Sequence, residues 1–121
     1  MFPHLFANYS FQRAMYSELL EVFEMSEHIL KASLQSLSSG ERERINLIRL
    51  FLSEPRILLL DEPFSHLDGR LFDQSIHFLE AYIHSHQALC ILATHTPERF
   101  PFATRILRFH TESSPTFSPY V

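Results

Sequence analysis

Two acidic residues, Asp61 and Glu62, directly follow the apolar run Ile57–Leu60. A continuous apolar run predicts a short strand buried on both faces, and open parallel sheets hold their ligands at the carboxyl ends of their strands. At that position one carboxylate can hold Mg²⁺, usually through water, and the next can orient or deprotonate an attacking water. The alternative is that both acids only end a strand and begin a turn, because the pattern is a loose one.

A second candidate segment places small residues and a glycine before a predicted helix: Leu37-Ser38-Ser39-Gly40-Glu41. Backbone N–H groups and a serine hydroxyl at the start of a helix can face a phosphate, because the helix dipole makes this end positive. The structural alternative is a plain capped helix, in which Ser38 or Ser39 is the N-cap and Glu41 or Glu43 completes a capping box.

Two more polar segments follow the predicted strands. Ser65-His66-Leu67-Asp68 comes shortly after the two acids, and Ala93-Thr94-His95-Thr96-Pro97 ends a second apolar run. A lone histidine after a strand is more often a loop residue than a catalytic one. Asp68 is also placed to cap the first turn of a helix. Taken singly, neither segment identifies a function.

The elements that must position these residues are predicted from the spacing of apolar side chains. Helical structure is expected over residues 11–33, with Ser26 as the cap of a short second helix, and again from Ser38 or Ser39 to Glu54. Strands are expected at residues 57–60, 88–93 and 105–109, with a helix over residues 68–85 and a short one near Pro97. This order indicates an α/β fold with a parallel sheet and an unstructured end from Ser113 onward.

Composition narrows the functional classes. The 121 residues are 45% hydrophobic and 20% charged, which is ordinary for one globular domain. The net charge of -4 and the lack of a dense Lys/Arg cluster argue against a nucleic-acid partner. A single cysteine, Cys90, fits a reducing cytosol, and no segment reads as a signal peptide or a membrane span.

The four polar segments, in this order and spacing, resemble the ATP-binding cassette (ABC) family. The stretch Arg42–Arg49 followed by Pro55 also resembles the signature helix of that family. The resemblance runs from about Leu37 to Pro97 and, more weakly, into the first residues of the chain. It implies a partial P-loop NTPase-like parallel sheet preceded by a helical subdomain segment. The expected divisions are residues 1–36 for that segment, 37–111 for the ATPase core and 112–121 for a disordered tail.

The resemblance also implies roles for individual residues, with ATP and Mg²⁺ as cofactors. Asp61 would be the Walker B aspartate that organises Mg²⁺, Glu62 the general base, and His95 the switch histidine that reaches the γ-phosphate. The segment Ser38-Ser39-Gly40-Glu41 would contact ATP held by the opposite subunit, and Asp68 would act in the D-loop across the dimer. Two residues depart from the family pattern: Ser39 replaces a usual glycine, and Glu41 a frequent glutamine.

A P-loop cannot be drawn in this sequence. It needs two glycines five positions apart and a lysine directly after the second, whereas the only glycines are Gly40 and Gly69 and the one lysine is Lys31. The leading hypothesis is an ATP-hydrolysing subunit of an ABC transporter, present as a C-terminal fragment. The alternative is a non-catalytic module that pairs with a complete ABC ATPase and donates signature and D-loop residues to its site.

Both hypotheses imply the same kinds of partner. These are a second ABC ATPase subunit or an N-terminal half-subunit, and the membrane subunit of a transporter. The expected location is therefore cytoplasmic, at the inner face of the cell membrane through that membrane subunit. A chromosome-maintenance or repair ATPase is a third possibility, because the signatures of such proteins often end in glutamate, as Glu41 does here.

Overall fold

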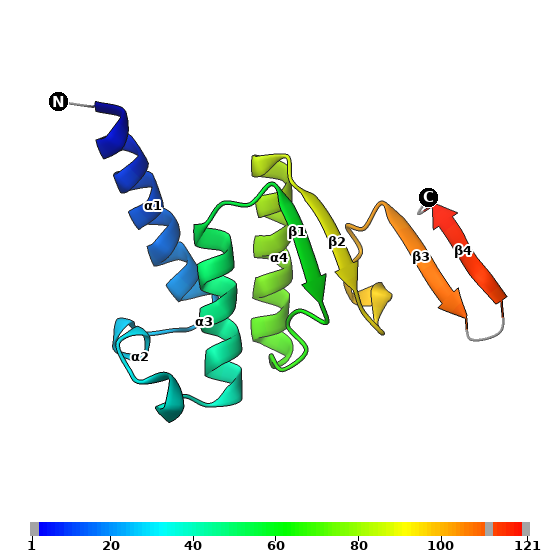
Figure 1. Ribbon diagram of the computed structural model, residues 1–121, viewed down its shortest axis with the longest axis horizontal. Coiled ribbons are helices and arrows are strands. Elements are labelled where there is room, and N and C mark those ends of the chain that lie inside the picture. The colour runs from blue at the N-terminus through cyan, green and yellow to red at the C-terminus, as the bar shows by residue number, and fades with distance from the viewer. Residues whose placement is uncertain (1–2, 111–112, 120–121) are drawn as a thin grey trace.

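The computed structural model describes residues 3–110 and 113–119, and its first half is helical (Figure 1). The helical elements are α1 (Pro3–Val22), α2 (Glu27–Leu30), the 3-10 turn η1 (Leu34–Ser36) and α3 (Ser39–Leu52). α1 begins earlier than the apolar spacing predicts, and it ends before Glu24, whose φ of 50° is left-handed. Ser26 precedes α2 as predicted, although its side chain makes no capping hydrogen bond. None of the described helices is long and apolar enough to cross a membrane.

The helix α3 begins where the sequence predicts and ends close to the predicted end at Glu54. Ser38 is its N-cap, and the helix stops two residues before Glu54, which has a φ of 49° and precedes Pro55. The left-handed backbone at Glu54 departs from right-handed helical geometry, which is disfavoured in any residue that precedes a proline. α3 buries one face, made of Ile45, Leu47, Ile48 and Phe51.

The parallel sheet is a single βαβ unit. β1 (Ile57–Asp61) is followed by α4 (Gly69–His86) and β2 (Leu89–Ala93), and the two strands pair in parallel. α4 is well capped, because the Asp68 carboxylate accepts a hydrogen bond from the Leu71 N–H at 2.9 Å. These elements confirm an α/β fold with a small parallel sheet.

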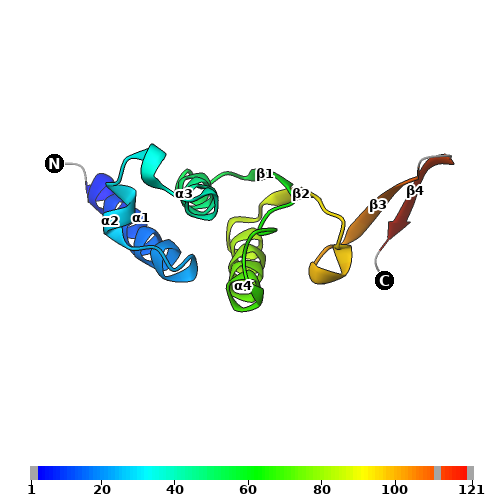
Figure 2. The same ribbon diagram turned by 90° about the horizontal axis from the view of Figure 1, so that it is seen from below.

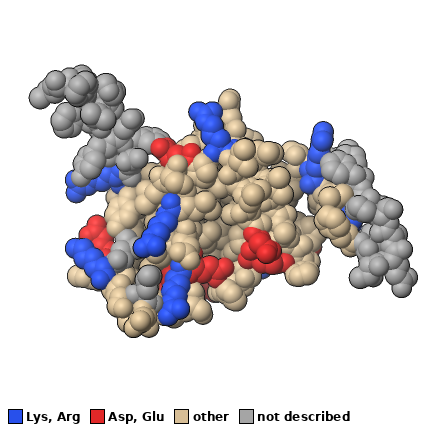
Figure 3. Space-filling view, in the orientation of Figure 1, with Lys and Arg blue, Asp and Glu red and all other residues tan. Residues whose placement is uncertain are grey.

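The prediction that the first strand is buried on both faces is wrong. Leu58 and Leu60 are buried, whereas Ile57 is 63% and Leu59 is 72% exposed. The reason is visible in Figure 2, where α4 lies against only one side of β1 and β2. The opposite side forms an uncharged surface in Figure 3. We call this surface the open sheet face, and its members are the exposed side chains of Ile57, Leu59, Leu89 and Ile91.

The last two strands also differ from the prediction. β3 (Arg105–His110) pairs antiparallel with β4 (Ser113–Pro119) and forms a separate two-stranded sheet. The expected third parallel strand therefore lies in another sheet, and the expected disordered tail is a strand over residues 113–119. Neighbouring segments pair at a small cost in loop entropy, so β4 is the readiest partner for β3. The two proposed domain boundaries stay predictions.

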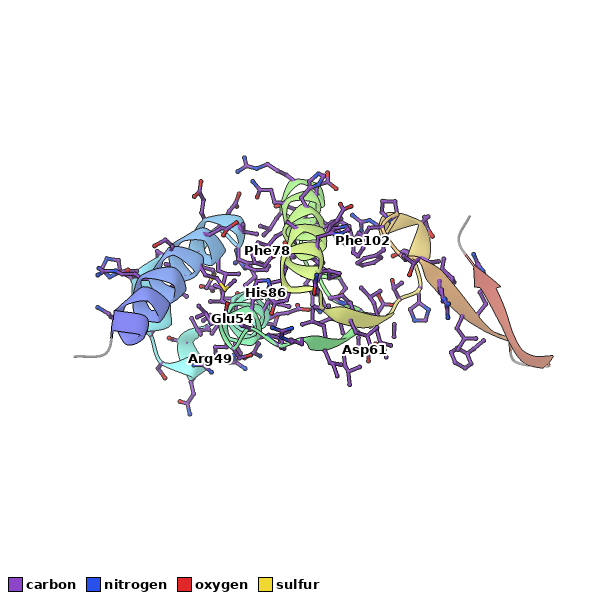
Figure 4. All side chains as sticks on the ribbon, turned by 90° about the horizontal axis from the view of Figure 1, so that it is seen from above. Arg49, Glu54, Asp61, Phe78, His86 and Phe102 are labelled. Carbon is purple, nitrogen blue, oxygen red and sulfur yellow. The ribbon has the colours of Figure 1, made fainter. Side chains whose placement is uncertain are left out.

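The core joins both halves of the chain. Phe23, after α1, packs against Phe51 of α3 at 6.4 Å between ring centroids, and against Phe78 of α4 at the same distance. Figure 4 shows Phe78 between α1 and α4. Leu58 and Leu60, on the covered face of β1, belong to the same cluster. The covered sheet face and three helices thus share one core, which holds the strand ends in place.

Candidate functional site

The two acids lie at the edge where both parallel strands end. Asp61 is the last residue of β1 and pairs in register with Ala93, the last residue of β2. Glu62 follows β1, and Thr94 and His95 follow β2. These residues therefore leave the sheet side by side. The sequence-predicted Walker B and switch segments meet at this edge, as expected for a ligand site on an open parallel sheet.

The carboxylate of Glu62 is held by the loop after β2. Oε1 accepts a hydrogen bond from the His95 backbone N–H at 2.6 Å, and Oε2 accepts one from the Thr94 hydroxyl at 3.3 Å. Glu62 itself has a φ of 44°, and its N–H donates to the Ala93 carbonyl at 2.8 Å. Three bonds thus fix both backbone and side chain of Glu62. Each carboxylate oxygen has two lone pairs, so a water can still donate to it.

The imidazole of His95 points into solvent. Its side chain is 97% exposed, and its Nε2 lies 3.7 Å from Glu62 Oε1. Glu62 keeps 35% of its own side chain exposed. A carboxylate and an imidazole are therefore side by side and open to a ligand, which suits proton transfer and contact with an anion.

Asp61, the residue before Glu62, is exposed at the end of β1. Within the described part of the chain, no group of three or more His, Cys, Asp or Glu side chains could hold a metal ion. Mg²⁺ is commonly bound through one or two carboxylates together with water and substrate phosphates. Asp61 fits that mode of binding and does not fit an all-protein cage.

The signature-like segment forms a complete capping box. The Ser38 Oγ accepts from the Glu41 N–H at 3.1 Å, and the Ser38 N–H donates to Glu41 Oε1 at 3.1 Å. The hydrogen bond from the Ser38 backbone N–H is the largest cause that lowers the pKa of the Glu41 carboxyl, and the Ser38 side chain is the next. The structural alternative inferred from the sequence, a capped helix with a capping box, is therefore present. A methyl group added at Gly40 would meet no atom within 4 Å, so packing does not require a glycine there.

The remaining predicted residues lie at the same end of the molecule. Figure 1 shows the starts of α3 and α4 at its lower edge, together with the ends of β1 and β2. His66, in the loop after β1, lies 3.8 Å from Glu43 of α3. The Asp68 carboxylate bonds the first turn of its own helix, and the Ser38 hydroxyl bonds Glu41. Neither of these two hydrogen bonds reaches Glu62. The structure gathers Glu62, Thr94 and His95 and leaves the helix starts as separate groups.

Sequence reasoning missed the part played by Thr94. Its hydroxyl bonds Glu62 and also accepts from the Thr96 N–H at 3.0 Å. The available signal was a hydroxyl residue directly after the second strand.

A separate cavity of about 330 Å³ lies beside α3 and η1, away from the strand ends. It is lined by Gln35, Arg42, Asn46 and Arg49, and Figure 4 shows Arg49 on this side of α3.

Comparisons with known proteins identify several relatives of this chain. Among the relatives, the sulfate/thiosulfate import ATP-binding protein CysA of Neisseria meningitidis serogroup A is 40% identical over 86 residues, 71% of this chain and 24% of that protein. The putative hemin import ATP-binding protein HrtA of Staphylococcus haemolyticus is 31% identical over 66% of this chain and 36% of that protein. The energy-dependent translational throttle protein EttA of Haemophilus influenzae is 42% identical over 53% of this chain and 11% of that protein.

The chain therefore spans about a quarter of CysA and about a third of HrtA. The model of the family described as ABC transporter matches residues 5–65, half of the chain. That range includes the capping-box segment and both acids, and it ends before His95. The matched residues and the acids at the end of a parallel strand lead to one conclusion: the chain belongs to the ABC transporter family.

Proposed function

We propose that this chain supplies the residues that activate water and contact the γ-phosphate at an ATP site in the ATPase of an ABC transporter. The observation that supports this most is the 2.6 Å hydrogen bond from the His95 N–H to Glu62 Oε1, which brings together two segments 33 residues apart. A local helix cap would instead bond groups within about three residues of Glu62. ATP and Mg²⁺ are the cofactors of the proposed reaction.

Each residue has a separate task in the proposed reaction. Glu62 accepts or orients the proton of the attacking water, because its carboxylate is already fixed and part of it is open to solvent. The exposed imidazole of His95 contacts the γ-phosphate. Asp61 would hold Mg²⁺, which when bound neutralises charge that develops on the phosphates.

This sequence contains no P-loop pattern that could cradle the phosphates. Gly40 and Gly69 are the only glycines in this sequence, and neither is followed by a lysine. We propose that the cradle comes from an N-terminal half, either in the same longer protein or as a separate piece. A second ATPase subunit and a transporter membrane subunit complete the proposed assembly, with the chain at the cytoplasmic face of the membrane.

Co-expression tests this proposal. The chain is produced together with an N-terminal piece of a related ATPase that carries a P-loop and a Q-loop, and phosphate release is measured. We expect hydrolysis that neither piece gives alone. Glu62→Gln should lower turnover by about a hundredfold or more while nucleotide binding persists, because only the proton acceptor is lost.

Glu98→Gln is the matched control, since Glu98 is an exposed acid three residues beyond His95. It should hydrolyse ATP at the rate of the unmodified pair. If Glu62→Gln hydrolyses ATP as fast as Glu98→Gln, the acids after β1 are structural and the proposed mechanism is wrong.

A second candidate function is a non-catalytic module that donates the start of α3, and Asp68, to the ATP site of a complete ABC ATPase. Gly40 favours it, because no packing contact among the described residues lies within 4 Å of a Cβ built there. Mixing the chain with a complete ATPase should then raise hydrolysis, and Gly40→Ala should abolish the gain without unfolding α3. Hydrolysis that stays the same on mixing would reject this alternative.

A further inference from the structure

The aromatic ring of Phe72 lies between the two loops that carry the proposed catalytic pair. Phe72 is in the first turns of α4 and is 4% exposed. It makes ring contacts with Phe64 on the loop after β1 and with Phe100 after the turn η2 (Pro97–Arg99). One side chain therefore touches both chain segments whose ends meet at Glu62 and His95.

The contact to the first loop is close in sequence to Glu62. Phe64 follows Glu62 by two residues, is fully buried, and has a left-handed φ of 69°. Its ring meets that of Phe72 edge to face, with centroids 6.1 Å apart. Because non-glycine residues rarely adopt a positive φ, packing must hold Phe64 in this conformation. The backbone after Glu62 is thereby tied to the ring of Phe72.

The contacts to the second loop come from two consecutive residues. Phe100 is 3% exposed and meets Phe72 edge to face, with centroids 5.9 Å apart. The guanidinium carbon of Arg99 lies 3.4 Å from the centre of the Phe72 ring, a cation–π geometry. The Arg99 N–H donates to the Thr96 carbonyl at 3.0 Å, so the turn that begins just after His95 is fixed on the same ring.

These contacts form a closed circuit. It runs from Glu62 through Phe64 to Phe72, on through Arg99 and Phe100 to His95, and back to Glu62 by the 2.6 Å hydrogen bond. We propose that Phe72 is a positioning residue, which sets the distance between the Glu62 carboxylate and the His95 backbone through these ring contacts. The inference rests on the proposed roles of Glu62 and His95, but its test reads geometry and needs no ATP.

The test is amide hydrogen exchange and ¹⁵N–¹H NMR of the full chain. The His95 amide reports directly on its bond to the Glu62 carboxylate, and Glu62→Gln gives the reference spectrum for the weakened bond. Arg99→Gln should speed exchange of the His95 amide about threefold, since an exposed cation–π contact is lost. Phe72→Leu should speed it about tenfold, because two aromatic pairs are removed. Both variants should shift the His95 amide toward its position in Glu62→Gln.

Controls separate positioning from general loosening. Arg70→Gln removes an arginine at the start of α4, whose side chain bonds Glu24 at 2.6 Å on the surface, and it should leave the His95 amide unchanged. Amides of Leu58 and Leu60, in the covered part of β1, should exchange as in the unmodified chain. Arg99 is exposed, so Arg99→Gln keeps the test usable even if Phe72→Leu does not fold. An unchanged His95 amide in folded Arg99→Gln, or equal acceleration at Leu58 and Leu60, would overturn the proposal.

Discussion

The backbone N–H of His95 and the carboxylate of Glu62 form a 2.6 Å hydrogen bond across 33 residues of chain. The bond uses the main chain of His95, so its imidazole is not needed to hold Glu62. That imidazole is 97% exposed and lies 3.7 Å from the same carboxylate oxygen. The geometry therefore separates two tasks within one residue: the backbone orients Glu62, and the side chain is open to a ligand.

His95→Ala should consequently keep the fold and lose activity. The free energy of unfolding should stay within about 0.5 kcal/mol of the unmodified chain, as is usual for exposed side chains. In the reconstituted ATPase, turnover should fall by about tenfold or more, because a γ-phosphate contact is lost. His84→Ala, at an exposed position near the end of α4, is the matched control and should change neither quantity. Equal turnover of the two variants would contradict the role given to His95.

The chain without an N-terminal half should not bind ATP with useful affinity. No P-loop pattern occurs in this sequence, so Asp61 would have to hold Mg²⁺ without the phosphate ligands that a cradled nucleotide supplies. Isothermal titration calorimetry of the purified chain with Mg·ATP measures this directly. Saturable binding at micromolar concentrations would reveal a phosphate site within the chain itself.

Two neighbouring leucines of β1 should respond very differently to the same substitution. Leu58 is fully buried and Leu59 is 72% exposed on the open sheet face. Leu58→Ala should lower the free energy of unfolding by about 2–5 kcal/mol, because it leaves a cavity in the core. Leu59→Ala should change it by less than about 0.5 kcal/mol and should reduce self-association, since it removes exposed apolar surface. Urea unfolding and light scattering test the pair, and similar losses of stability would show that the open face is covered.

The capping box should make stability depend on acid pH. The Ser38 N–H lowers the pKa of the Glu41 carboxyl below its ordinary value of 4.5. A carboxyl whose pKa is lower in the folded state stabilises that state when ionised, so its contribution is complete above about pH 4.5. The contribution is then lost as the pH falls through the folded pKa. Urea unfolding at several pH values should show the unmodified chain losing more stability than Glu41→Gln, and parallel profiles would exclude the effect.

Features that depend on a few neighbouring residues were predicted correctly from the sequence. Ser38 and Glu41 start α3, and Asp68 starts α4, because a cap is made with groups within three residues of it. The break before Pro55 is local as well. The acids after an apolar run were likewise placed at the end of a strand, and the family was identified from the order of four short segments.

Features that depend on distant groups were decided only by the tertiary structure. The sequence could not show that α4 covers one face of β1 alone, nor that β3 pairs with β4, because a run of apolar side chains does not specify what lies against it. The bond between Glu62 and His95 depends on the parallel register of β1 with β2, and the ring of Phe72 touches loops that lie on either side of it in the chain. Such contacts form only when packing brings remote segments together, and no local pattern encodes them.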